Sequence, residues 1–108
     1  MASNVMERLP FRLGSQIEYE AGHVVRKDLV SAKGGGVSML AFDKDVKIDV
    51  HSVPFAVMIQ IVEGAFEISI EDNLHYMKKN DVVVMPPNTL HAVKALEPGK
   101  LMLIHIND

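Results

Sequence analysis

Composition excludes several classes of protein. The chain has 108 residues, 48% hydrophobic and 23% charged, with a formal net charge of -3 and no cysteine. This length suits one domain, and the apolar content argues against disorder. The absence of cysteine excludes disulfides and thiolate metal sites. Because the basic residues are scattered and outnumbered, we expect no nucleic-acid partner.

Two further observations concern the membrane. Residues 1–10 contain no apolar segment of the kind found in secretory signals. No apolar run approaches the roughly 18 residues that a membrane-spanning helix needs. We therefore expect no membrane partner and a cytoplasmic location.

The chain is predicted to be an N-terminal arm of residues 1–15 followed by one all-β domain of residues 16–108. Short apolar segments alternate with Gly, Pro, Asn and Asp, and this spacing is typical of a sandwich or barrel. The predicted strands are 23–30, 37–42, 46–50, 55–62, 65–71, 74–78, 82–85, 91–95 and 100–106.

Local patterns refine this prediction. Residues 65–70 alternate between apolar and polar and predict a half-buried strand, whereas the nearly continuous apolar run 55–62 predicts a strand covered on both faces. The glycines at 34–36 are expected to form a mobile loop. Asp72 and Asn73 are expected to form a two-residue hairpin turn.

One histidine stands at each end of the central strands. The first lies in Asp49-Val50-His51-Ser52-Val53, ahead of Gly64, and the second in Met85-Pro86-Pro87-Asn88-Thr89-Leu90-His91. These segments resemble the two motifs of the cupin superfamily. The resemblance implies a cupin double-stranded β-helix, or jelly-roll barrel, in which the rings of His51 and His91 lie within about 5 Å of one another, as two ligands of one ion would.

The sequence also departs from the cupin motifs. Val53 stands where a second histidine is usual, and Val57 where the acidic or amide ligand is usual. Asp45, Asn80 and Asn88 replace glycines. The two asparagines cost the fold little because Asn tolerates positive φ. The usual metal ligands are therefore reduced to His51 and His91.

The resemblance implies three alternative functions. The first is a cupin that binds a small molecule and, weakly, a divalent metal (Zn, Ni, Mn or Fe), because two imidazoles leave most of the metal shell to water. The second is a metal-dependent enzyme, such as an oxygenase, isomerase or epimerase. The third is a non-catalytic interaction module. The resemblance and the high apolar content also imply a homodimer.

Candidate site residues follow from the same resemblance. His51 and His91 are the candidate metal ligands, and no catalytic residue is assigned. His105, in an apolar strand, is expected to be structural. The residues expected to line the pocket are Val53, Val57, Ile59, Met85 and Val93.

Overall fold

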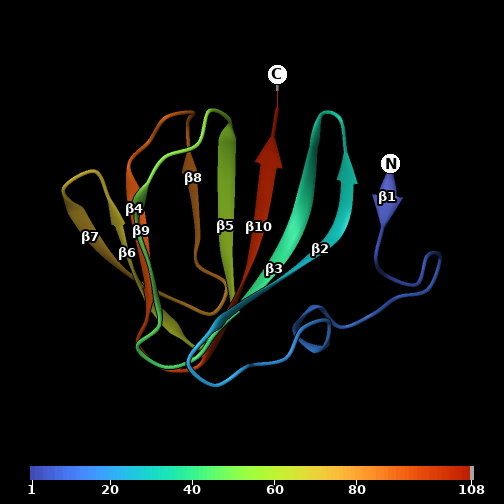
Figure 1. Ribbon diagram of the computed structural model, residues 1–108, viewed down its shortest axis with the longest axis horizontal. Helices are drawn as coiled ribbons and strands as arrows, with labels where there is room; N and C mark the ends of the chain where they lie inside the picture. The colour runs from blue at the N-terminus through green and yellow to red at the C-terminus, as the bar shows by residue number, and fades with distance from the viewer. Residues whose placement is uncertain (108) are drawn as a thin grey trace.

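A computed structural model, which describes residues 1–107, shows two antiparallel β-sheets facing each other (Figure 1). In spatial order, the larger sheet contains β1 (Ala2–Ser3), β2 (Val24–Ala32), β3 (Gly35–Phe42), β10 (Gly99–Ile106), β5 (Ala56–Glu63) and β8 (Val82–Met85). The smaller sheet contains β4 (Lys47–His51), β9 (His91–Ala95), β6 (Ala65–Ile70) and β7 (Asn73–Lys78). The fold is the all-β jelly roll that the sequence predicts.

The main core lies between the two sheets. Strand β5 shows how it is built, because its alternate residues Val57, Ile59 and Ile61 are buried while the residues between them are partly exposed. Phe42 and Phe66 meet edge to face at the centre, with ring centroids 5.2 Å apart. Burial of each such side chain contributes about 1.5–3 kcal/mol, so this layer is the main source of stability.

A second apolar cluster covers the outer face of the larger sheet. Its buried members are Ile17, Leu29, Met39 and Ala41. Residues of the N-terminal segment, which includes a short 3-10 helix (Leu13–Ser15), pack against this cluster. The segment is also held by polar contacts, since the Nζ of Lys100 donates a hydrogen bond of 2.6 Å to the carbonyl of Gly14. The arm is thus attached to the barrel along its outer face.

The predicted strands are present, and their ends differ from the prediction by two residues at most. The Gly, Pro, Asn and Asp residues between the apolar segments explain this agreement, because they mark where one strand ends and the next begins. All three residues that replace glycines of the motifs adopt positive φ, namely Asp45 (65°), Asn80 (75°) and Asn88 (66°). No helix in residues 1–107 is long and apolar enough to cross a membrane.

Three local predictions are wrong. Gly35 and Gly36 belong to β3 rather than to a loop, and they lie against His105 of β10, where the Cβ of any other residue at position 35 would come 2.3 Å from a carbonyl oxygen. The hairpin turn uses residues 71 and 72, not 72 and 73, because Ile70 pairs with Asn73. Strand β5 is fully buried on one face only.

A glycine is required where the chain crosses between the sheets. Gly64 joins β5 to β6 with φ of 81°, and an added Cβ would lie 2.6 Å from the backbone of Pro98 and Gly99. The close approach explains the glycine at this position of the motif.

Candidate functional site

His51 and His91 are paired residues on neighbouring strands. His51 ends β4 and His91 begins β9, and the two are direct partners in the antiparallel ladder. Their ring centroids are 4.2 Å apart, and their planes are inclined by 53°. The side chains therefore converge as the resemblance implied, while metal binding by them stays a prediction.

A β-bulge in β4 aims His51 at the interior. Ile48 pairs with Val93 and His51 with His91, so three steps along β4 oppose two along β9. In a regular strand, residues three apart point to opposite faces. The extra residue lets both Ile48, which packs on the main core, and His51 face inward.

Backbone carbonyls hold both rings in one tautomer. The Nδ1 of His51 lies 3.0 Å from the carbonyl oxygen of Asp49, and the Nδ1 of His91 lies 2.9 Å from that of Thr89. A carbonyl can only accept, so in the neutral ring Nδ1 carries the proton and Nε2 keeps its lone pair. Within residues 1–107 no protein atom forms a hydrogen bond with either Nε2. Every buried side-chain nitrogen in this part of the chain has a partner, so a nitrogen without one is not buried. Both Nε2 atoms are therefore accessible.

The two rings form part of the wall of a cavity of about 210 Å³, which we call the barrel pocket. Its lining residues are Arg26, His51, Val53, Phe55, Val57, His91, Leu103 and His105. His91 is only 5% exposed, so it lies in the wall and not at the rim.

Of the five residues expected to line the pocket, Val53 and Val57 do so and three do not. Ile59, Met85 and Val93 are buried in the main core below it. Ile59 and Val93 follow Val57 and His91 by two residues, on the same inward faces but one row deeper. Met85, on β8, pairs with Val57 of β5 and is fully buried. These three side chains therefore pack inside the main core and do not reach the cavity.

Sequence reasoning missed two polar residues of the pocket. Arg26 comes from β2 and His105 from β10, both outside the segments that resemble the cupin motifs. The ring of His105 packs against Phe55, with centroids 5.1 Å apart. The alternation of side chains along the strand could have predicted the place of His105, because Leu101, Leu103 and His105 lie on the same face. His105 is therefore part of the pocket as well as of the barrel wall.

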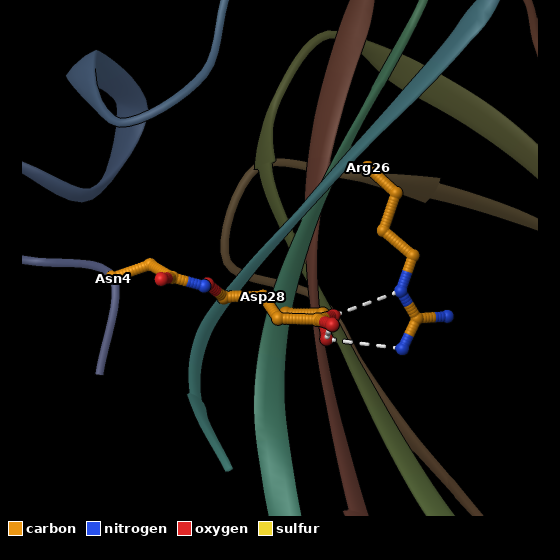
Figure 2. Close-up of polar contacts among 4 residues, drawn as sticks. Asn4, Arg26 and Asp28 are labelled. Carbon is orange, nitrogen blue, oxygen red and sulfur yellow. Dashed lines mark hydrogen bonds and ion pairs between the residues drawn. The ribbon is translucent and has the colours of Figure 1, made fainter. Parts of the chain in front are cut away.

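Arg26 is held in place by two residues of the same sheet (Figure 2). Its Nε donates to the Oδ1 of Asp28 over 3.0 Å, and its Nη2 donates to the Oγ of Ser38 over 3.2 Å. The Ser38 hydroxyl, which is buried, donates to the same Asp28 oxygen over 2.7 Å. Hydrogen bonds from Ser38 and Arg26 lower the pKa of Asp28 below its ordinary value, so its carboxylate is ionised at neutral pH.

The donor set does not fit a complete cupin metal centre. Residues 1–107 contain no group of three or more His, Cys, Asp or Glu side chains placed to hold one ion. Val53 and Val57 line the pocket beside His51 with methyl groups, which cannot donate electron pairs to a metal. What remains is a pair of accessible imidazole nitrogens, which can supply two of the four to six donors that a transition metal takes.

Comparisons with known proteins identify the fold. No protein-family model and no curated protein match the chain. Among solved structures, a cupin superfamily protein from Desulfitobacterium hafniense is 21% identical, with a TM-score of 0.92 over 98% of this chain and 97% of that one. A conserved protein of unknown function from Streptococcus pyogenes is 24% identical, with a TM-score of 0.91 over 100% of this chain and 96% of that one.

A third structure extends the comparison to a larger protein. A cupin 2 conserved barrel domain protein from Leptotrichia buccalis is 27% identical, with a TM-score of 0.83 over 90% of this chain but 47% of that one. Three chains of different origin thus share the arrangement of the two sheets described above. The chain has the fold of the cupin superfamily.

Proposed function

We propose that this protein binds a small molecule in the barrel pocket and holds a divalent transition metal weakly at His51 and His91. The observation that supports this most directly is the histidine pair itself. Two rings 4.2 Å apart share one cavity, and each has its Nδ1 engaged by a carbonyl and its Nε2 free. In metal-binding histidines, the ring nitrogen that does not bind the metal usually donates a hydrogen bond to such a partner.

Weak binding follows from the number of donors. Two imidazoles leave two to four positions of a Zn, Ni, Mn or Fe ion to water or to a bound ligand. A small molecule with oxygen donors can complete the shell, so ion and ligand would then bind cooperatively. The proposed ion is thus an accessory to ligand binding.

Calorimetric titration with Zn²⁺ tests the histidine pair. We expect one weak site per chain, with a dissociation constant on the order of micromolar to millimolar. His51→Ala and His91→Ala should each abolish it, because one imidazole alone binds too weakly to detect. His75→Ala is the matched control, since His75 is exposed on β7, outside the pocket lining. Unchanged binding in both pocket variants would contradict the proposal.

The alternative of a metal-dependent enzyme has less support. The lining of the barrel pocket includes no carboxylate. The carboxylate of Asp28, which contacts the lining residue Arg26, accepts hydrogen bonds from Arg26 and Ser38. General base catalysis would therefore fall to a histidine. Small-molecule binding needs only the cavity and its polar groups, so it is the function that we favour.

We also propose a homodimer that forms through the outer face of the larger sheet. One cross-strand row on that face consists of Val84, Met58, Ile104 and Val37, in β8, β5, β10 and β3. Val84 is 65% exposed, and the others are partly exposed. An apolar row without charges, on a broad sheet face, is suited to packing against a second copy.

A further inference from the structure

We infer that the barrel pocket takes a small carboxylate with an apolar body, and that Arg26 binds the carboxylate group. This inference rests on the proposed function, because it names the class of small molecule that would enter the same cavity. It depends on the placement of Arg26, on the tautomers of the histidines and on the apolar part of the lining.

Arg26 keeps free hydrogen-bond donors. Of the five N–H donors of an arginine, one on Nε is used by Asp28 and one on Nη2 by Ser38, and the described part of the chain offers no partner for the other three. Figure 2 shows the third nitrogen of the guanidinium pointing away from Asp28. The guanidinium is thus oriented before a ligand arrives, which lowers the entropic cost of binding.

The charge of the site suits a monoanion. Arg26 is the one permanent cation in the lining, and Asp28 offsets part of its charge. A dianion such as phosphate would find too little positive charge, because no helix N-terminus or second guanidinium lines the cavity. Arginine pairs well with a planar carboxylate because the two groups match in geometry.

In the tautomer that the two carbonyls select, the histidine pair does not favour an anion. With Nδ1 donating to a carbonyl, each Nε2 presents a lone pair and repels a carboxylate oxygen. The pair can instead accept a hydrogen bond from a ligand hydroxyl or hold an ion. The carboxylate is therefore assigned to Arg26, whose side chain is 52% exposed at the rim.

The remaining wall favours an apolar body. Val53, Phe55, Val57 and Leu103 line the cavity between the polar groups. Its volume of about 210 Å³ equals that of roughly seven water molecules at about 30 Å³ each. A short branched or single-ring carboxylic acid fits this space.

Matched acids and amides test the inference. The probes are isobutyrate and benzoate against isobutyramide and benzamide, each titrated into the full chain and followed by ¹H–¹⁵N NMR. We expect each acid to bind at least about tenfold more tightly than its amide, with shifts at pocket residues. Arg26→Gln should remove this difference, and Arg26→Lys should keep part of it. Lys27→Gln is the matched control, because Lys27 is the next residue of β2 and reaches Gln16 on the outer face.

The outcomes separate this inference from the proposed function. Amides that bind as tightly as the acids, or acids that bind Arg26→Gln as tightly as the wild type, would overturn the carboxylate inference and leave pocket binding intact. Inorganic phosphate that binds more tightly than either acid would also overturn it. If neither acids nor amides bind, the inference fails, and failure of the Zn²⁺ titration as well would remove the proposed function.

Discussion

At the scale of single residues, two backbone carbonyls decide what the pocket histidines can do. Asp49 and Thr89 each accept from a ring two residues further along the chain, so both imidazoles expose the same nitrogen. The side chains that would complete a metal shell are absent, because Val53 and Val57 stand beside the pair. The pocket thus presents two imidazole nitrogens beside an apolar wall.

Replacing those two valines tests their placement. Val53→His with Val57→Glu should create four donors with His51 and His91, so Ni²⁺ or Mn²⁺ should raise the melting temperature far more than in the wild type. Without metal, the double variant should be less stable by a few kcal/mol, because Val57 is buried and a carboxylate there lacks a partner. The Val53→His single variant should give an intermediate, metal-dependent shift. A folded double variant with no such shift would mean that residues 53 and 57 do not face His51.

At the scale of strands, the sequence predicted the elements well because turn residues separate them. The resemblance to the cupin motifs also implied that the rings of His51 and His91 lie close together, as they do. That the two residues are direct partners on neighbouring strands came from the structure. The bulge in β4 was not predictable, since nothing between Ile48 and His51 distinguishes an extra residue from a regular strand. Arg26 and His105 were missed because their strands, β2 and β10, join the pocket only through sheet pairing distant in the chain.

The crossing between sheets gives a prediction for one element. Gly64→Ala should destabilise the protein by at least about 2 kcal/mol, because the residue combines positive φ with a backbone contact that a methyl group cannot share. Gly34→Ala is the control, since an added Cβ there meets nothing within 4 Å. Denaturant unfolding measures both. Equal stability of the two variants would contradict the role assigned to Gly64.

At the scale of the molecule, the two faces of the larger sheet have different roles. The inner face carries the main core and the barrel pocket, while the outer face is partly covered by the N-terminal segment. The outer face also carries the apolar row from Val84 to Val37, and Val37 at the end of the row packs against the second apolar cluster. The barrel pocket is lined from the inner face of this sheet, so a partner bound to the outer face would leave the pocket accessible.

The proposed dimer gives a prediction at this scale. Ile104→Lys places a charge in the middle of the apolar row and should convert the dimer to a monomer, since a buried unpaired charge is costly. Leu74→Lys is the control, because Leu74 is 66% exposed on β7 of the other sheet. Light scattering after size exclusion gives the mass of each. A wild-type monomer, or an Ile104→Lys variant that stays dimeric, would contradict the proposed interface.

The most direct test of the central claim is the state of the histidine rings in solution. Long-range ¹H–¹⁵N NMR at neutral to mildly basic pH reports which nitrogen of each ring carries the proton. His51 and His91 are predicted to be protonated on Nδ1, and their Nε2 signals should shift together on addition of Zn²⁺, while those of His75 stay in place. Protonation of both rings on Nε2, or a Zn²⁺ response confined to other histidines, would contradict the account.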